Sequence, residues 1–404
     1  MKKIVLALFF ISSYVQAYDF GLLLYQNAGP EGDGSNFALD YSAVLVPRFS
    51  TSLGNSGDIL ISAGVTVNYE DEKWSYIPEL LRTEITGRIG SLRMKAGRIQ
   101  YADPLNYVME GLFDGAQFLF DTAVGTFSAG AWYTGLLYKN KATITITQAE
   151  LDSYDAAVDY NDFFNTYFAP PRILAALGWE HPAVGELVHI KFALAGQFDL
   201  NDENPYHSQY ALLKASIPVK RFVFELGGCF QTAQAVEAVD TKDQFSVGFA
   251  GELGLSWAPL APFQSQLSLN ARYSSGRAEN GSIAAFVPVT TKYQGNILEA
   301  KLSGISAFNL DYTARLHRTF SSSLTASYFI RNDLETYMNY PMNGSEDSDG
   351  YCLGGELYGR FIWNLVSDLR LNLGGGVFLP SLGNTAPDTE PRWSVELGIV
   401  LALR

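Results

Sequence analysis

Charged residues recur at every second position in several segments of the chain, and this spacing limits the chemistry they can perform. Arg82, Glu84 and Arg88 share one register, and so do Arg93 and Lys95. Because successive side chains of a β-strand point to opposite faces, each set would lie on one face of a strand. Such a face can attract or guide ions by its charge, whereas nucleophilic catalysis would need a nucleophile and a base brought to one point.

The basic residues with this spacing allow two interpretations. They could form a track that guides anionic solutes through a pore, or they could pair with acidic residues on neighbouring strands and stabilise the wall. The candidates for the track are Arg82, Arg88, Arg93, Lys95, Lys191, Arg272, Arg360 and Arg370.

Residues for other kinds of chemistry are scattered. The four histidines have no metal-ligand spacing, and no GxSxG motif or Ser/His/Asp grouping is present. We therefore expect no catalytic residues, no metal, no cofactor and no enzymatic activity. A net charge of −14 also disfavours nucleic acid as a partner, since neutralising phosphates needs basic surface.

The elements that must position these charges are long alternating segments. Most exceed the 5–6 residues typical of strands in soluble proteins and match, with a margin, the 9–11 residues with which a tilted strand crosses a bilayer. The segments are 19–28, 36–49, 58–69, 76–89, 91–101, 115–122, 124–137, 172–181, 186–198, 208–218, 220–232, 243–257, 263–276, 298–316, 319–332, 351–363, 367–379 and 392–403. Eighteen segments predict an all-β transmembrane antiparallel barrel of eighteen strands, with sixteen as the alternative.

The last segment has the pattern expected of a strand that closes such a barrel. From Trp393 to Leu403, large apolar residues occupy one face, and Ser394, Glu396 and Gly398 lie on the other. A sheet in lipid can have no free edge, so this strand would have to pair with the segment that begins near Asp19. We expect its apolar face to contact lipid and Glu396 to face the lumen.

The connections alternate between short turns and long loops, which is typical of outer-membrane barrels. Nine longer connections hold 26 acidic and six basic residues, so the acidity of the chain is mainly a property of its expected outer loops. Two of these loops are rich in apolar residues, 102–114 and 138–171. One of them would fold into the lumen as a constriction, or both would pack together as a lid. The candidates in the constriction loop are Asp103, Glu110 and Asp114.

The N-terminus predicts export. Lys2 and Lys3 precede an apolar stretch that is too short to span a bilayer as a helix, and Val15 to Ala17 form a small-residue cleavage pattern. We expect a signal peptide at 1–17 and a single barrel domain at 18–404, located in the outer membrane with its lipids as partners. The pattern is compatible with a monomer and with a trimer.

Two stretches resemble known families. Glu396, Gly398, Leu401 and Leu403 resemble the C-terminal assembly signal of outer-membrane barrels, although that signal usually ends in Phe and here Arg404 follows. The resemblance implies insertion by the barrel-assembly machinery. Residues 97–116 are similar to a strand–loop–strand unit of the eighteen-stranded alginate-export and substrate-specific porins, although the dense arginine lining of the export family is absent here.

The function predicted from these features is a porin-like channel for passive diffusion of small hydrophilic solutes, with anionic solutes as one option. Two alternatives belong to other classes. One is a structural or adhesive barrel with a plugged lumen, and the other is an outer-membrane transporter of hydrophobic ligands of the fatty-acid type. The transporter would need a continuous apolar pocket, which the alternating polar faces oppose.

Overall fold

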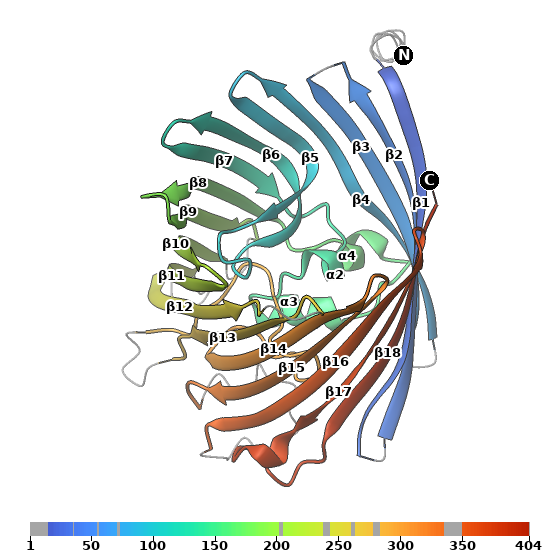
Figure 1. The fold of residues 1–404 in the computed structure, drawn as a ribbon, viewed down its shortest axis with the longest axis vertical. Helices are drawn as coiled ribbons and strands as arrows, with labels where there is room; N and C mark the ends of the chain where they lie inside the picture. Colours follow the sequence, from blue (N-terminus) through green and yellow to red (C-terminus); the bar gives the residue numbers. More distant parts are fainter. Residues whose placement is uncertain are drawn as a thin grey trace.

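The computed structural model describes residues 15–34, 36–54, 56–70, 73–201, 205–236, 243–259, 263–277, 283–334 and 350–403. Within these ranges the chain forms eighteen antiparallel strands in one sheet, and each strand pairs with its neighbours in sequence. Strand β18 (Arg392–Leu403) also pairs with β1 (Val15–Asp33), so the sheet closes into a barrel (Figure 1). The prediction of eighteen strands is confirmed, and the alternative of sixteen is excluded.

The remaining strands follow one another around the wall. They are β2 Asn36–Leu53, β3 Gly57–Glu70, β4 Lys73–Ile89, β5 Leu92–Ala102, β6 Glu110–Thr122, β7 Gly125–Tyr133, β8 Arg172–Val184, β9 Val188–Asp199, β10 Tyr206–Val219, β11 Phe222–Val236, β12 Asp243–Trp257, β13 Gln266–Ser274, β14 Ile305–His317, β15 Phe320–Arg331, β16 Cys352–Val366 and β17 Leu369–Leu379. Short helices occur in two connections: α2 Lys139–Ala142, α3 Gln148–Asp155 and α4 Phe163–Tyr167 between β7 and β8, and the 3-10 helix η2 Pro380–Leu382 after β17.

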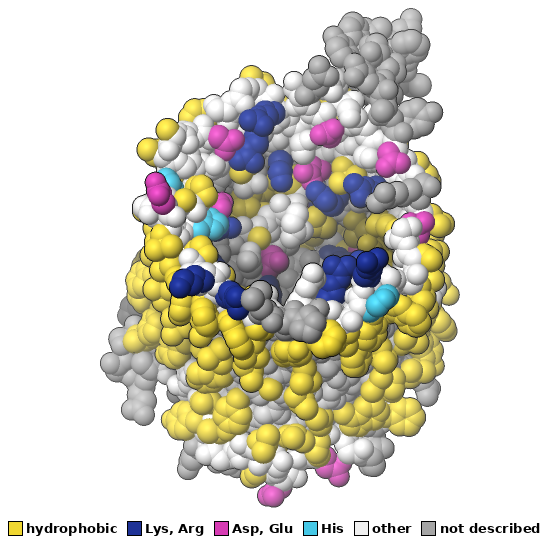
Figure 2. All heavy atoms as spheres, viewed as in Figure 1, with side chains coloured by type: hydrophobic (Ala, Val, Ile, Leu, Met, Phe, Trp, Pro, Cys, Tyr) yellow, Lys and Arg dark blue, Asp and Glu magenta, His cyan; other side chains and the backbone are white. Residues whose placement is uncertain are grey.

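Alternation along the strands separates an apolar outer face from a polar lumen. In β18, Val395, Leu397 and Leu403 are exposed on the outside, while Glu396 faces inward. Figure 2 shows the same apolar covering over the outer wall. A charged side chain on the lipid face would cost about 2–4 kcal/mol at mid-bilayer, which explains why charges occupy the inner face. None of the helices in the described ranges is long and apolar enough to cross a bilayer.

The two ends of the barrel differ in their connections. We call the end with the long connections the outer end. Two of the loops expected there are shorter than predicted, because β1 continues to Asp33 before β2 begins at Asn36, and β3 continues to Glu70 before β4 begins at Lys73. These strands therefore extend as hairpins beyond the length that a bilayer requires. The strand expected at 298–316 begins only at Ile305, because residues 298–304 belong to a loop inside the barrel.

Three outer loops fold into the lumen and pack into a shared core, which we call the plug. They connect β5 to β6, β7 to β8 and β13 to β14, and Figure 1 shows the helices of the second loop inside the ring of strands. The fully buried apolar residues of the plug include Leu105, Tyr107, Val108, Met109, Phe286, Leu298 and Leu302.

Backbone hydrogen bonds join the three loops to each other. The amide of Val289 donates to the carbonyl of Val108 at 2.8 Å, and the amide of Thr291 donates to the carbonyl of Thr143 at 2.7 Å. These bonds satisfy backbone groups that would otherwise be buried without partners. The expectation that one loop folds inward is therefore correct for 102–114, but the plug also takes in part of 138–171 and the β13–β14 loop.

Candidate functional site

The plug fills only part of the lumen. Its buried core packs against wall residues of strands from β5 to β17, such as Ile99, Leu212 and Phe378. Among the described residues, no member of this core comes from β1 to β4 or from β18. Among the described residues, the side of the lumen bordered by β18, β1, β2 and β3 is therefore free of this apolar packing, and we call this side the passage.

The outer part of this passage is a cavity of about 720 Å³, which we call the outer chamber. One side is the wall of β1, β2, β3 and β18, and the other is the plug segment 296–299 of the β13–β14 loop. The strand register explains the polar lining. Asn27 pairs with Ser42 across β1 and β2, and Glu31 pairs with Ser394 across β1 and β18, so that these side chains share the inner face.

The inner part of the barrel holds two further cavities, one of about 470 Å³ along β2 to β6 and one of about 410 Å³ along β1 to β4. Arg88, Arg93 and Lys95 line the first, together with Asp58. Arg48 and Glu84 line the second, and Asp58 also contributes to it. Figure 2 shows a hollow at one end of the molecule with lysine and arginine side chains around its rim. The inner cavities are thus mixed in charge, with basic residues well represented.

Most of the predicted basic candidates have an acidic partner. Arg82 pairs with Glu84. The other ion pairs are Arg93 with Asp121 at 2.7 Å, Lys191 with Glu180 at 3.6 Å, Arg272 with Glu252 at 3.5 Å and Arg360 with Glu396 at 3.7 Å. Pairing of this kind agrees with the interpretation that these residues stabilise the wall, and it reduces the net positive charge they offer to a solute.

The other three candidates bond to uncharged groups or line a cavity. Arg88 donates to the carbonyl of Gly90 at 3.2 Å, Arg370 donates to the side-chain oxygen of Asn364 at 3.0 Å, and Lys95 lines the larger inner cavity. Of these three, Arg88 and Lys95 line the larger inner cavity near β4 and β5, whereas Arg370 lies on β17.

Two of the three acidic candidates of the constriction loop hold the plug together, and the third pairs within the wall. Asp103 accepts four backbone N–H bonds within its own loop, including 2.7 Å bonds from Leu105 and Met109. Burial raises the pKa of Asp103, and these four bonds oppose that rise. Glu110 pairs with Lys292 of the β13–β14 loop at 2.9 Å, and Asp114 pairs with Arg98 at 2.7 Å. None of the three lines the outer chamber or the two inner cavities described above.

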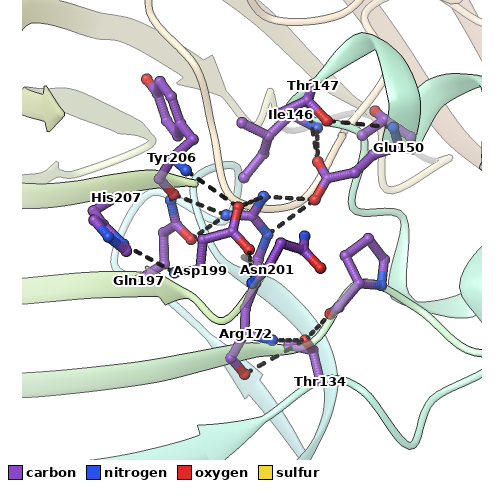
Figure 3. Close-up of polar contacts among 12 residues, drawn as sticks. Thr134, Ile146, Thr147, Glu150, Arg172, Gln197, Asp199, Asn201, Tyr206 and His207 are labelled. Carbon is purple, nitrogen blue, oxygen red and sulfur yellow. Dashed lines mark hydrogen bonds and ion pairs between the residues drawn. The ribbon is translucent and has the colours of Figure 1, made fainter. Parts of the chain in front are cut away.

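A buried arginine that was not among the candidates anchors the plug to the wall. Arg172, at the start of β8, is 0% exposed. Its guanidinium pairs with Glu150 of α3 at 2.5 Å and with Asp199 of β9 at 2.8 Å, and it donates to the carbonyl of Tyr206 at 3.0 Å (Figure 3). Bidentate and charge-assisted bonds of this kind fix geometry strongly.

The helix that carries Glu150 has a sequence signal that could have revealed it. Thr147 and Glu150 form a capping box, in which the Thr147 hydroxyl accepts from the Glu150 amide and the Glu150 carboxylate accepts from the Thr147 amide. The T-x-x-E pattern is a recognised helix start. The second carboxylate oxygen of Glu150 remains for Arg172, so one side chain both starts α3 and attaches it to the wall.

A second anchor fixes the plug segment that borders the outer chamber. Glu356 of β16 is 4% exposed and accepts N–H bonds from Asn296, Ile297 and Leu298 at 2.7–3.0 Å. These three N–H bonds to one carboxylate hold this turn of the loop in place, so that the next residue, Glu299, lines the chamber. No local pattern marks Glu356, because its partners lie about sixty residues away in the chain.

The residues of the expected assembly signal lie where the pattern placed them. Glu396 lines the outer chamber, Gly398 lies against Asn372 of β17, and Leu401 and Leu403 share the outer face. Their recognition by the barrel-assembly machinery stays a prediction.

The arrangement supports selection by charge and size. Within the described ranges, no group of three His, Cys, Asp or Glu side chains could hold a metal ion. The architecture is a closed antiparallel barrel with an apolar outer wall, a polar lumen and inward-folded loops, which is the class to which porin-type barrels belong.

No family model matches the sequence, and no curated protein matches it. The fold does match solved structures from Pseudomonas aeruginosa. OccK2 (OpdF) in complex with glucuronate aligns with a TM-score of 0.62 at 11% identity over 96% of this chain and 99% of that one. The outer membrane protein OpdK aligns at 0.61 with 12% identity over 96% and 99%, and OccK10 (OpdN) at 0.58 with 13% identity over 95% and 99%. At these identities the likeness shows a shared fold.

Proposed function

We propose that this protein is an outer-membrane channel through which small hydrophilic solutes diffuse passively. The observation that carries the proposal is the polar passage between the plug and the wall of β1, β2, β3 and β18, whose outer part has a volume of about 720 Å³. A hydrated lumen narrowed by inward loops is the usual way in which a barrel restricts solute size. Insertion by the barrel-assembly machinery after removal of residues 1–17 belongs to the same proposal.

The structural neighbours support the class of solute. OccK2 was crystallised with glucuronate, a small hydrophilic sugar acid. By analogy we infer that molecules of comparable size and polarity pass through this barrel. The basic residues Arg88, Arg93 and Lys95 would contribute to the inner end of the route, where they line a cavity.

The two alternative functions make different demands on the lumen. A hydrophobic-ligand transporter would need an apolar interior, yet the outer chamber is lined largely by polar and charged side chains. A structural barrel with a fully plugged lumen is the stronger competitor, because the plug has its own buried core.

Planar-bilayer recording of the purified protein separates these possibilities. The proposal predicts stable conductance steps. Ser42→Trp should reduce the step size, because Ser42 lies in the outer chamber, whereas Leu45→Trp on the exposed outer face of the same strand should leave it unchanged. Insertion without any conductance would refute the channel and favour the plugged barrel. Equal effects of the two substitutions would refute the assignment of the passage.

A further inference from the structure

The outer chamber has a strongly one-sided charge. The carboxylates that line it are those of Glu31, Asp33, Asp40, Glu70, Glu299 and Glu396, and Arg392 is the one basic residue among its lining residues. Arg360 approaches Glu396 to 3.7 Å from the neighbouring wall. Even with that neighbour included, the acidic groups outnumber the basic ones by a wide margin.

The carboxylates surround the cavity on several sides. Glu31 and Asp33 project from the inner face of β1, and Glu396 projects from the inner face of the adjoining strand β18. Glu299 approaches from the opposite side, at the end of the plug segment that Glu356 fixes. A small ion in the chamber would therefore have negative groups on both the wall and the plug.

The chamber also lies on the route past the plug. The main apolar core of the plug packs against strands from β5 to β17, and Tyr138 and Tyr167 of the β7–β8 loop pack on Ile77 of β4. Among the described residues, neither cluster takes in β1, β2, β3 or β18. A solute entering from the outer end meets the chamber where low-dielectric walls focus the field of its charges. Charges placed at such a constriction determine which ions enter, as rings of carboxylates do in cation channels.

We propose that the outer chamber makes the channel prefer cations, namely inorganic cations and small organic molecules with a protonated amine, over anions. The inference rests on the proposed channel function and deepens it by naming the charge class of the solute. The basic candidates do not oppose this preference at the outer end. Most are paired with carboxylates, and Arg88, Arg93 and Lys95 line a separate inner cavity.

The test is the reversal potential of single channels in a gradient of KCl. Recording at or below about 0.1 M salt keeps the charges effective over roughly 10 Å. We expect potassium to permeate about tenfold better than chloride, in line with the concentration effect of a focused field. The triple variant Glu31→Gln, Asp33→Asn, Glu299→Gln should lower this ratio several-fold while conductance steps persist.

A matched triple variant controls for overall charge. Glu186→Gln, Asp388→Asn and Glu390→Gln remove the same number of charges from exposed positions in strand connections, none of which lines the chamber. The permeability ratio should stay at the wild-type value. Glu31→Gln alone should give an intermediate ratio, which provides a readout even where the triple chamber variant inserts poorly.

The outcomes separate the two proposals. An anion preference of the wild-type channel would overturn the inference and leave the channel function standing. The same loss of selectivity in both triple variants would also overturn it, because the effect would then come from general surface charge. Absence of any conductance would instead contradict the channel function itself.

Discussion

Arg172 shows how a single buried charge holds the plug in place. Its guanidinium has two carboxylate partners, Glu150 from the plug and Asp199 from the wall, and its side chain is completely buried. Removing one partner from such a network leaves buried charges uncompensated, which typically costs about 3–5 kcal/mol.

The first prediction follows from this network. Arg172→Ala should lower the free energy of unfolding by about 3–5 kcal/mol, because Glu150 and Asp199 would then repel each other in a buried space. Urea titration of the protein refolded into lipid vesicles measures the change. The triple variant Arg172→Met, Glu150→Gln, Asp199→Asn removes all three charges and should recover much of the loss. No recovery would argue against charge imbalance as the cause.

Glu356 leads to a prediction about the plug rather than about overall stability. Its carboxylate accepts three backbone N–H bonds from 296–298, and an amide side chain offers only one acceptor oxygen. Glu356→Gln should therefore loosen this segment and increase current noise in single-channel records. Glu390→Gln, at an exposed position in the β17–β18 connection, is the control. Identical noise in the two variants would contradict the role of Glu356.

At the scale of elements, the ladder between β4 and β5 is interrupted. Strands β4 and β5 pair only from Thr83 with Arg98 to Ile89 with Leu92, although β4 begins ten residues before Thr83, at Lys73. The upper part of β4 bonds instead to side chains. The Tyr160 hydroxyl accepts from the amide of Tyr76 at 3.0 Å and donates to its carbonyl at 2.9 Å.

The hydrogen bonds between the Tyr160 hydroxyl and the backbone of β4 can be tested by hydrogen exchange. Tyr160→Phe removes the acceptor of the Tyr76 amide, so exchange in a peptide that covers 74–78 should accelerate severalfold. The matched control is Tyr312→Phe, at an exposed position of the lipid-facing wall. Unchanged exchange at β4 would show that protection of this backbone does not depend on Tyr160.

The strands could be predicted from the sequence because alternation is a local property. All eighteen segments from 19–28 to 392–403 correspond to strands of the barrel. The plug could be predicted only in part. The apolar residues of 102–114 indicated an inward loop, but Phe286, Val289 and Leu298 were assigned to an outer connection or to the start of a strand.

The reason for these misses is physical. An apolar residue in a loop must be buried somewhere, yet the pattern does not say against which partner. The hydrogen bonds that determine the partner are long-range, such as the bond between Val289 and Val108 or the bond between Asn296 and Glu356. The position of the passage follows from the same contacts. The acidic residues of the loops could therefore be recognised in the sequence, but their assembly around one chamber could not be predicted from it.

At the scale of the whole molecule, the two ends of the lumen differ in charge. Carboxylates dominate the outer chamber, whereas arginine and lysine side chains take part in the inner cavities. Glu299 is the chamber carboxylate whose pKa is shifted by its surroundings. Burial raises its pKa above that of an ordinary glutamate, Glu31, Glu396 and Glu356 raise it further, and Arg392 lowers it.

This asymmetry predicts that the cation preference depends on the pH of one compartment more than on that of the other. A raised pKa means that Glu299 takes up a proton at a higher pH than an ordinary glutamate, so cation preference should begin to fall earlier as pH decreases. Acidifying the compartment that faces the long loops should have the larger effect on the reversal potential. The Glu299→Gln variant should have a weaker cation preference at neutral pH, and this preference should not show the early decrease on acidification. The same titration curve in both proteins would contradict the assignment.

The chamber has one further consequence, which concerns how the protein is made. Its wall joins the first strand of the chain to the last, since Glu31 and Asp33 of β1 pair with Ser394 and Arg392 of β18. The proposed charge filter is therefore complete only when β1 and β18 have paired. A chain that stalls before its ends meet would leave this side of the plug open. The protein would therefore acquire the proposed cation selectivity only when the barrel closes.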